Sequence, residues 1–536
     1  MGKICFISIK KDELKFERLL NSVRALEVPE GWDIDFLETT CENGIAAAYN
    51  EALGNICAAI NIYIDGEAEI VDAGLLIKLA DVFSRDEKIA VIGAIGAEYV
   101  PANGMASESA KIYGNIMRED AKILCGKECI EDYKEVMAVE GFFMAIRGRL
   151  RWRDDLFRGE AFYDTAQCVE YKRIGLKTVV LTEGVPIVKY DRKSISISKT
   201  EKNSFLDEYS KDIYPLVTIL IPTYQRPGFF KLALESVLAQ TYRNLEIFIS
   251  DNSNDERTKT LMDDYLKRDK RIIYEHHPEF NRHENWERVY TYDNPKAEYI
   301  NWLMDDDLYA PDKIEKMIDY YFQDDSIALV TSFRQRIDEN GNDVPANAAN
   351  APIVESTQRF DGKSVGKALL QQCLNFIGEP TTVLLKKKLL KGRLLGWSGR
   401  EGRFLVEDYT VWLRLLQYGD MIYIREPLSF FRTHSGQDQN SVEYLALNAI
   451  CWAHMIQYAI HNKVYLTDDK SIRQTYCGWI SRVLDSFPTL ADNEEKLTPI
   501  EKEDYKKLKD ILYNVSSYLS GRGTSDFEVD TSSEFS

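Results

Sequence analysis

Strand-like and helix-like segments alternate through the second half of the chain, and this alternation constrains the fold more than any other feature. Residues 216–224, LVTILIPTY, form a β-rich run that ends in a turn, and residues 230–242 place Leu and Val at helical spacing. A second strand pattern ends at Asp251, and a third, AEYINWLM, ends just before three aspartates. Alternation of this kind predicts an α/β fold, a mostly parallel sheet with helices on both faces.

The three adjacent carboxylates that follow the third strand are Asp305, Asp306 and Asp307. Like charges side by side repel, so folding them into a shaped site costs free energy unless a cation or water offsets the repulsion. An isolated acidic triplet is most often a solvated turn. In parallel sheets, however, ligands bind outside the carboxyl ends of the strands. We therefore expect Asp251 and the triplet to converge on one crevice, although more than fifty positions separate them.

Length and composition indicate a folded protein of several domains. A chain of 536 residues is long enough for two or three domains, and its 45% hydrophobic and 11% aromatic content supports packed cores. The formal net charge of −19 argues against a nucleic-acid partner, because such proteins neutralise phosphates with Lys and Arg. A local site for a metal ion and an anionic nucleotide remains compatible with this net charge.

Cysteine usage and hydropathy suggest the compartment. The nine cysteines include no CxxC pair, which is typical of reduced thiols in a cytoplasmic protein. The first twenty residues lack a secretory pattern, and the apolar stretch 444–460 is too short and too polar to span a bilayer. We expect a cytoplasmic protein without a transmembrane segment, at most peripheral at the inner face of the membrane.

Changes of pattern along the chain predict five segments. Residues 1–200 form a first α/β domain, 201–214 a polar linker, and 215–440 a second α/β domain. Residues 441–520 show helical periodicity without strand patterns. The Gly- and Ser-rich stretch 521–536 is expected to be a disordered tail.

Six motifs follow one another in the second half: VTILIPTYQR, LESVLAQTYRNLEIFISDNSND, EYINWLMDDDLYAPDKI, IGEPTTVLL, EDYTVWLRLLQYG and FFRTH. In this order they resemble glycosyltransferase family 2, the inverting nucleotide-sugar transferases of GT-A fold. The resemblance covers residues 214–441. It implies a metal-dependent enzyme of polysaccharide biosynthesis that moves a sugar from a nucleotide sugar to a glycan, lipid-linked or protein acceptor.

The resemblance places the nucleotide sugar at the ends of the first three strands. The positions that match are Pro222, Thr223, Tyr224, Arg226, Asp251 and Asp305. In this family the aspartate at the position of Asp251 accepts a hydrogen bond from the base, and Asp305 meets the ribose. A carboxylate suits the imide N–H of uracil, which favours UDP as the carrier. The structural alternative for Asp251 is a turn-capping aspartate.

By the same resemblance the metal ion, Mn²⁺ or Mg²⁺, binds to Asp306, counted back from Pro311. Asp307, a nearby carboxylate with a less defined role, and His434 in FFRTH are counted as further metal ligands. Oxygen ligands suit a hard divalent cation, and an added imidazole favours Mn²⁺. Met304 stands where many members carry an acid. The alternative for His434 is packing beneath a surface loop.

An inverting transfer needs a carboxylate that accepts the proton of the acceptor hydroxyl. The resemblance assigns this role to Asp408, with Glu407 supporting it or contacting the acceptor. Glu379, in GEPT, is a candidate on the acceptor side. The alternative for Asp408 is an acid in the first turn of a helix, where the helix dipole favours negative charge.

The first half resembles a second, degenerate GT-A-like domain. Its metal motif reads Asp65-Gly66-Glu67, and AFYDTAQ carries Ala161 and Ala166 where polar residues are usual, while Asp164 remains. The chain is thus expected to hold two tandem GT-A-like domains with mostly parallel central sheets, followed by a C-terminal helical region. The losses favour a non-catalytic first domain.

Two other interpretations stay open at this point. In one, both domains transfer sugars, as in glycan polymerases. In the other, the chain is a carbohydrate- or nucleotide-binding scaffold without turnover. The acidic triplet, the Glu407-Asp408 pair and His434 favour the enzyme.

Overall fold

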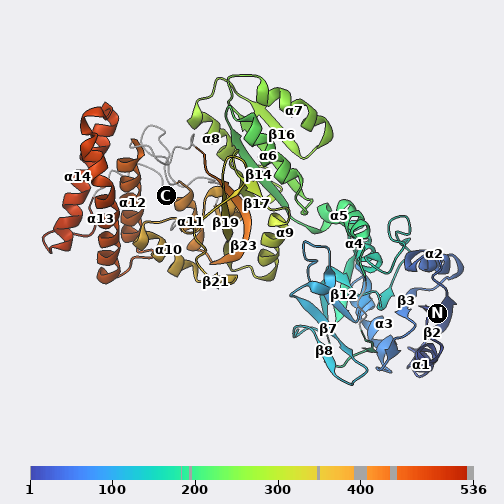
Figure 1. The fold of residues 1–536 in the computed structure, drawn as a ribbon. Helices are drawn as coiled ribbons and strands as arrows, with labels where there is room; N and C mark the ends of the chain where they lie inside the picture. The colour runs from blue at the N-terminus through green and yellow to red at the C-terminus, as the bar shows by residue number, and fades with distance from the viewer. Residues whose placement is uncertain are drawn as a thin grey trace. The chain divides into compact units, whose positions relative to one another are not determined.

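The computed structural model describes residues 2–182, 184–191, 196–346, 350–390, 407–434 and 443–527. The chain divides into two compact units, Met1–Tyr214 and Pro215–Ser536. Each unit has its own central sheet and its own hydrophobic core (Figure 1).

The N-terminal unit is built on a seven-stranded sheet. Its strands are β1 (Gly2–Ile9), β2 (Trp32–Thr39), β3 (Ile60–Asp65), β5 (Ile89–Gly93), β9 (Tyr133–Val136), β11 (Phe143–Ile146) and β12 (Lys177–Leu181). Their order is β2-β1-β3-β11-β5-β12-β9. A smaller sheet contains β4 (Glu69–Ile70), β6 (Ile95–Ala97), β7 (Ile112–Met117), β8 (Ile123–Cys125), β10 (Ala138–Val139) and β13 (Val188–Lys189). The helices are α1 (Glu13–Arg24), α2 (Ile45–Asn55), α3 (Leu75–Arg85), α4 (Tyr163–Arg173) and α5 (Lys199–Ile213).

The C-terminal unit contains a ten-stranded sheet. Its strands are β14 (Leu216–Thr223), β15 (Leu245–Asp251), β16 (Ile272–His276), β17 (Ala297–Trp302), β18 (Leu308–Tyr309), β19 (Ile327–Ile337), β20 (Asp343–Val344), β21 (Gln358–Phe360), β22 (Leu384–Lys386) and β23 (Asp420–Arg432). Its helices are α6 (Pro227–Leu238), α7 (Arg257–Arg268), α8 (Arg282–Thr291), α9 (Lys313–Gln323), α10 (Gly362–Gln372) and α11 (Glu407–Leu416), followed by α12 (Glu443–His461), α13 (Asp469–Asp492) and α14 (Pro499–Leu519).

The predicted α/β architecture is confirmed, but the central sheets are mixed and not mostly parallel: three of six strand pairings are parallel in the N-terminal sheet and four of nine in the C-terminal sheet. Strands β14, β15 and β17 coincide with the three apolar runs that end in polar residues. Strand β14 lies between the other two and is parallel to both. Its last residue, Thr223, is paired with Asp251, the last residue of β15. The carboxyl ends of the three strands therefore lie at one edge of the sheet.

The two units repeat one strand order. In the N-terminal unit it reads β2-β1-β3-β11-β5-β12, and in the C-terminal unit β15-β14-β17-β22-β19-β23. The directions agree at every step, with β11 and β22 each antiparallel to both neighbours. The chain is a tandem repeat of one fold, as the sequence predicts.

The segment 201–214, expected to be a polar linker, is instead most of helix α5. Phe205 and Tyr209 on this helix are fully buried, and Phe205 stacks on Phe162 with ring centroids 4.7 Å apart. Arg173 of α4 pairs with Glu208 and Asp212 at 2.9 and 2.8 Å. The charged residues suggested a solvated link, but they lie beside an apolar stripe that packs α5 onto its own unit.

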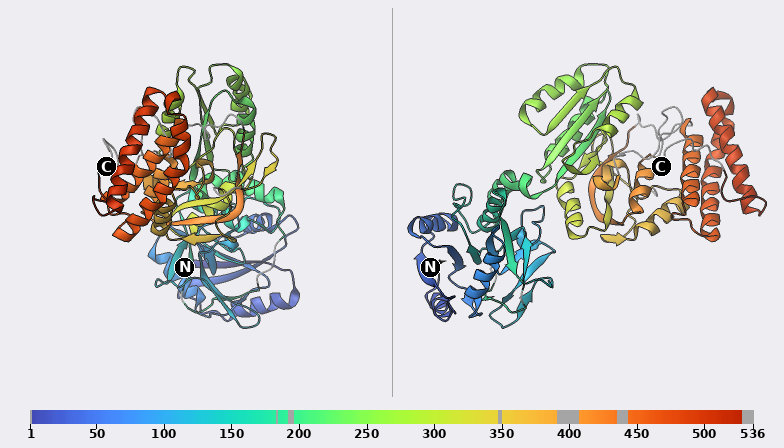
Figure 2. Two further views of the ribbon diagram at one scale, coloured as in Figure 1. Left: turned by 60° about the vertical axis from the view of Figure 1, so that its left-hand side comes forward. Right: turned by 180° about the vertical axis from the view of Figure 1, so that it is seen from behind.

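The predicted C-terminal helical region is present as α12, α13 and α14, which lie side by side in Figures 1 and 2. Their buried residues, among them Ile450, Trp479 and Tyr505, share one core cluster with Trp412 of α11 and Leu369 of α10. The helices are therefore continuous with the core of the C-terminal unit.

The start of the expected disordered tail is ordered. Residues 521–527 are described, and the Phe527 ring stacks near Tyr476 at a centroid distance of 6.1 Å. The Tyr476 hydroxyl donates to the Ser525 carbonyl at 2.9 Å. The remainder of the tail, 528–536, lies outside the described residues.

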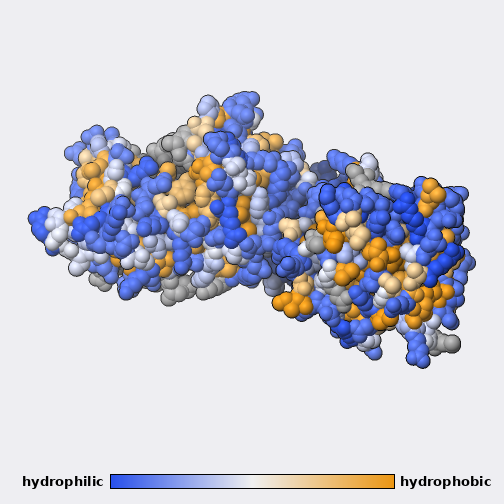
Figure 3. Space-filling view, turned by 90° about the horizontal axis from the view of Figure 1, so that it is seen from below, coloured by the Kyte–Doolittle hydropathy of each residue, from blue (hydrophilic) through white to orange (hydrophobic). Residues whose placement is uncertain are grey.

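Among the residues that the structure describes, none of the helices combines the length and apolar character that crossing a bilayer requires. Figure 3 shows polar and apolar residues interspersed on one face of the molecule. Exposed large apolar residues in the N-terminal unit include Ile123, Leu124 and Ile130.

Truncation of Phe205 tests the packing of α5. Phe205→Ala should destabilise the N-terminal unit by about 3–5 kcal/mol, because a buried aromatic ring leaves a cavity. Urea denaturation of the full chain measures the change, and Lys211→Ala on the exposed face of the same helix should stay within about 0.5 kcal/mol. Equal stability of both variants would restore the flexible-linker interpretation.

Candidate active site

Side chains from the ends of β14, β15 and β17 meet at one edge of the C-terminal sheet. Residues Pro222 and Thr223 end β14, and the Thr223 hydroxyl donates to Asp305 Oδ2 at 2.9 Å. The Tyr224 N–H donates to the same oxygen at 3.3 Å. Because Thr223 is paired with Asp251 and bonded to Asp305, it links two of the predicted site residues directly.

Asp305 is held in a largely buried position, with 9% of its surface exposed. Burial, followed by the neighbouring charge of Asp306, raises the pKa of the Asp305 carboxyl to about 6. The Arg226 guanidinium, 3.7 Å away, and the Thr223 hydroxyl oppose this rise. A carboxyl with these surroundings takes up a proton readily unless another cation or donor arrives.

The Asp306 carboxylate contacts both the Arg226 guanidinium and the His434 imidazole. Its Oδ2 accepts a hydrogen bond from Arg226 Nη1 at 3.2 Å and lies 2.9 Å from His434 Nε2. The His434 ring also contacts the Phe229 ring, with centroids 5.3 Å apart. The structure thus brings Arg226, Asp306 and His434 together from the residue before α6, the turn after β17 and the residues after β23.

Asp307 faces the protein interior, in contrast to its expected place among the metal ligands. It is 1% exposed, its Oδ2 accepts from the Thr381 hydroxyl at 2.6 Å, and its Oδ1 accepts from the Arg432 N–H at 3.1 Å. Burial and the charge of Asp306 raise its pKa well above the usual range. Both oxygens accept hydrogen bonds from the fold, so Asp307 supports the turn, and its role as a metal ligand stays a prediction.

A buried arginine that the sequence analysis did not single out fixes this turn. Arg432 is 1% exposed, and its Nε donates to the Asp306 carbonyl at 2.8 Å. Its Nη1 donates to the carbonyls of Asp338 and Glu339 at 3.0 and 3.1 Å, and its guanidinium lies over the Phe229 ring. The motif FFRTH contains Arg432, but only the distant partners reveal its role.

Asp251 is fully buried at the end of β15. Its Oδ1 accepts from the Ser253 N–H at 2.8 Å, and its Oδ2 accepts from the Tyr274 hydroxyl at 2.7 Å. The Ser253 contact is the turn-capping bond that the structural alternative predicts. Each carboxylate oxygen has a second lone pair, so these bonds leave Asp251 able to accept from a base as well.

Asp408 is the second residue of α11, and it is half-buried. Burial, followed by the charge of Glu379, raises the pKa of its carboxyl to about 8. Asn375 Nδ2 donates to Asp408 Oδ2 at 3.2 Å. On the buried face of the same helix, Trp412 Nε1 donates to the Gly378 carbonyl at 3.2 Å, which ties α11 to the segment before β22. A carboxyl with such a pKa is suited to proton transfer near neutral pH.

Glu379 acts electrostatically on two other acidic residues, Asp307 and Asp408. It forms an ion pair with Arg334, whose side chain is 5% exposed. Its charge contributes to the raised pKa of both Asp307 and Asp408. The sequence analysis placed Glu379 on the acceptor side but missed Arg334 and Asn375, which no local pattern marks.

Glu407 begins α11, and its side chain is outside the described residues.

The N-terminal unit presents a different arrangement at α4. Asp164 there accepts hydrogen bonds from the Gly141 and Thr165 N–H groups at 2.8 and 2.7 Å, which engage both oxygens. Ala161 and Ala166 are buried, so the usual polar positions have become part of the core.

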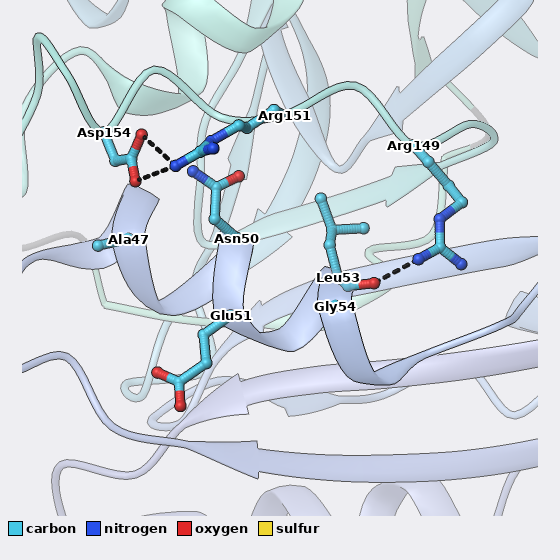
Figure 4. Close-up of a pocket in the computed structure, with 8 residues that line it drawn as sticks. All are labelled: Ala47, Asn50, Glu51, Leu53, Gly54, Arg149, Arg151 and Asp154. Atoms are coloured by element: carbon cyan, nitrogen blue, oxygen red, sulfur yellow. Dashed lines mark hydrogen bonds and ion pairs between the residues drawn. The ribbon is translucent and has the colours of Figure 1, made fainter.

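A cavity of about 500 Å³ opens on the N-terminal unit, away from these strand ends (Figure 4). Its lining residues are Ala47, Asn50, Glu51, Leu53, Gly54, Arg149, Arg151 and Asp154. Arg149 donates to the Leu53 carbonyl at the end of α2, and Arg151 pairs with Asp154 at 3.0 Å. Both arginines bind their own chain, and none of the predicted site residues lines this cavity.

Replacement of Arg432 tests its role in holding the acidic turn. Arg432→Met removes the donors to three carbonyl groups and should lower the free energy of unfolding by about 3–5 kcal/mol. Urea denaturation measures the loss. Arg257→Met, which breaks an exposed pair with Asp255, should cost less than about 1 kcal/mol. A similar small effect at both positions would show that Arg432 does not support the turn.

Comparison with known proteins agrees with this architecture. Residues 5–209 match a family model described as Glycosyltransferase like family, and residues 218–392 match Glycosyl transferase family 2. The second match ends before Asp408 and His434. An uncharacterized glycosyltransferase of Rickettsia typhi is 28% identical over 44% of this chain and 70% of its own length. One from Rickettsia prowazekii is 26% identical over 43% and 68%.

A crystal structure of S. aureus TarS 1-349 in complex with UDP-GlcNAc superposes with a TM-score of 0.41 and 15% identity. The superposition covers 58% of this chain and 84% of that chain, and at this TM-score it does not bear on the assignment. The family matches and the shared strand order lead to one conclusion: the chain contains two glycosyltransferase-like domains in tandem, and the second, over residues 218–392, matches glycosyl transferase family 2.

Proposed function

We propose that the C-terminal unit is a metal-dependent inverting glycosyltransferase that uses Asp408 as general base. Its donor is a UDP-sugar, and its acceptor is a hydroxyl group of a glycan, a lipid-linked sugar or a protein. The single observation that carries the proposal is the position of Asp408, half-buried in the first turn of α11 and held by Asn375, where burial raises the pKa of its carboxyl to about 8.

Each side chain of the site has a separate task in this proposal. Thr223 and Tyr224 hold Asp305 in place for the ribose, and Arg226 sits where it can meet diphosphate oxygens. Asn375 orients the Asp408 carboxylate, which takes the proton as the acceptor oxygen attacks the anomeric carbon. Attack from the face opposite the departing nucleotide inverts the configuration at that carbon.

The donor set at Asp306 fits a divalent cation in part. Across the described ranges, no cluster of three or more His, Cys, Asp or Glu side chains is already arranged to hold a metal ion. Asp306 Oδ2 and His434 Nε2 lie 2.9 Å apart, however, and an oxygen–nitrogen pair of this kind suits Mn²⁺. These two residues would hold the ion, with diphosphate oxygens and water completing its coordination. When bound, the ion would neutralise charge on the departing nucleotide.

The choice of UDP rests on Asp251. A carboxylate accepts hydrogen bonds and cannot donate them, so it matches the imide N–H of uracil. Tyr274 and Ser253 hold the carboxylate in a fixed orientation, and burial keeps competing water away. In the N-terminal unit Ala161 and Ala166 are buried where polar residues are usual, which supports a non-catalytic role for that unit.

The substitution Asp408→Asn separates a catalytic base from a helix-terminal acid. The amide keeps the shape but cannot accept the proton, so transfer should fall by about 10²–10⁴-fold, equivalent to roughly 3–5 kcal/mol. Release of UDP from a panel of UDP-sugars with acceptor measures the rate. In the unsubstituted enzyme kcat/KM should fall about tenfold per pH unit below the Asp408 pKa of about 8, because the base must be ionised.

The thermal stability of the same variant gives an independent result. The folded-state pKa of Asp408 is raised, so stability is greatest when the group is protonated and falls as pH rises through about 8. At pH 9 Asp408→Asn should therefore melt at a higher temperature than the unsubstituted chain. A helix-terminal acid would behave oppositely, with near-normal turnover and a loss of about 0.3–1 kcal/mol.

The cation site is tested by Asp306→Asn. The amide has nearly the same volume but lacks the charge that holds the ion, so Mn²⁺-dependent binding of UDP should be lost while the fold remains. Calorimetric titration of UDP with Mn²⁺ and with a chelator measures both states. Asp312→Asn, at a half-buried acid that directly precedes α9, is the matched control. Unchanged Mn²⁺-dependent affinity in Asp306→Asn would remove Asp306 from the metal site.

A further inference from the structure

The repeat of one fold allows the two acidic turns to be compared residue by residue. In the C-terminal unit the Asp307 N–H donates to the Met304 carbonyl at 3.1 Å, and in the N-terminal unit the Ala68 N–H donates to the Asp65 carbonyl at 2.9 Å. Both turns follow the third strand of the shared order. On this register Glu67 stands where Asp306 stands, so the comparison rests on the function proposed for Asp306.

The carboxylates of the N-terminal turn are already bound to lysines. Lys15 Nζ lies 2.7 Å from Glu67 Oε2, and the Glu67 side chain is only 12% exposed. Lys11 Nζ lies 3.8 Å from Asp65 Oδ2 and 2.8 Å from Glu160 Oε1. The Asp65 Oδ1 atom accepts the Glu67 N–H at 2.9 Å. The hydrogen bond with Glu67 raises the pKa of the Lys15 ammonium, which keeps it charged.

The N-terminal unit also lacks the imidazole. All six histidines of the chain lie beyond residue 214, so no residue of this unit can replace His434 with a ring nitrogen. Tyr190 lies near the acidic pair and stacks on Phe142 with ring centroids 4.6 Å apart. Burial, followed by the charges of Asp65 and Glu67, raises the pKa of the Tyr190 phenol, so it remains protonated and is a poor metal ligand.

The C-terminal unit differs in how its charge is balanced. There a single arginine, with 37% of its side chain exposed, is shared between Asp305 and Asp306 at 3.7 and 3.2 Å. In the N-terminal unit a separate ammonium pairs with Glu67 at contact distance. A divalent cation approaching Glu67 would meet this positive charge within a few ångströms, where like charges repel strongly.

We infer that Lys11 and Lys15 are built-in counter-ions of Asp65 and Glu67, and that the N-terminal unit binds no divalent cation at this turn. The residues that a glycosyltransferase fold would offer to a metal ion are present in part, but their charge is satisfied by the chain itself. Metal dependence of the whole protein then comes from the C-terminal unit.

Titration of the full chain with Mn²⁺ alone, followed by the electron paramagnetic resonance of the free ion, tests this inference. The Asp306→Asn background removes the proposed site of the C-terminal unit. In that background no Mn²⁺ should bind at the N-terminal turn. Adding Lys11→Met and Lys15→Met should create a Mn²⁺ site at this turn, because two positive charges are gone. Its affinity should be at least about tenfold higher than any affinity of the Asp306→Asn variant for Mn²⁺. A further Glu67→Gln should abolish it.

The matched control is Lys3→Met with Lys122→Met, which removes the same charge from lysines paired with Asp35 and Asp120. It should create no site. Mn²⁺ binding that survives Asp306→Asn and disappears on Glu67→Gln would overturn the inference. Absence of any gain in the lysine variant, with a cooperative melting transition showing that it folds, would overturn it as well. If Asp306→Asn alone abolishes Mn²⁺ binding, that result supports the metal site proposed for the C-terminal unit. It does not test the inference about the N-terminal turn.

Discussion

The burial of three adjacent carboxylates is the constraint around which the C-terminal unit is organised. Three charges at the end of β17 would repel one another and lose hydration, so donors have to reach them from several parts of the chain. Thr223 supplies a hydroxyl from β14, Thr381 another from the segment before β22, and Arg432 of β23 supplies its backbone N–H to Asp307. The Arg432 side chain holds the turn by donating to the Asp306 backbone carbonyl. The inner carboxylate, Asp307, thereby becomes part of the fold, while Asp305 and Asp306 are contacted by Thr223, Arg226 and His434.

The sequence was sufficient to predict the positions of the strands and the meeting of Asp251 with the acidic triplet. Alternating periodicity defines the strands, and parallel strands bring their carboxyl ends to one edge. It was not sufficient to predict which of the three carboxylates is buried, because that depends on Thr381 and Arg432, which lie 74 and 125 positions from Asp307. Helix α5 was missed for a different reason. Its many charged residues suggested a linker, although Phe205, Leu206 and Tyr209 form one apolar face.

The tandem repeat shows how one fold supports different sites. Both units have the same strand order, and both place an acidic turn after the third strand. Beyond the shared strand order, the site residues that differ lie at the strand ends and at the first turn of a helix. Asp408 is held by a side-chain amide, whereas Asp164 is held by backbone N–H groups. Chemistry is thus determined by the residues placed on the fold and not by the fold itself.

Helix α5 also has a consequence for how the chain can be cut. The helix ends at Ile213 and β14 begins at Leu216, so only Tyr214 and Pro215 separate the last helix of one unit from the first strand of the next. The Tyr214 hydroxyl donates to the Pro101 carbonyl at 2.6 Å, and the Pro215 carbonyl accepts from the Tyr242 hydroxyl at 2.5 Å. Proteases need several extended, accessible residues around the scissile bond. The junction offers no such stretch of extended, accessible residues, so the two units should resist separation by limited proteolysis.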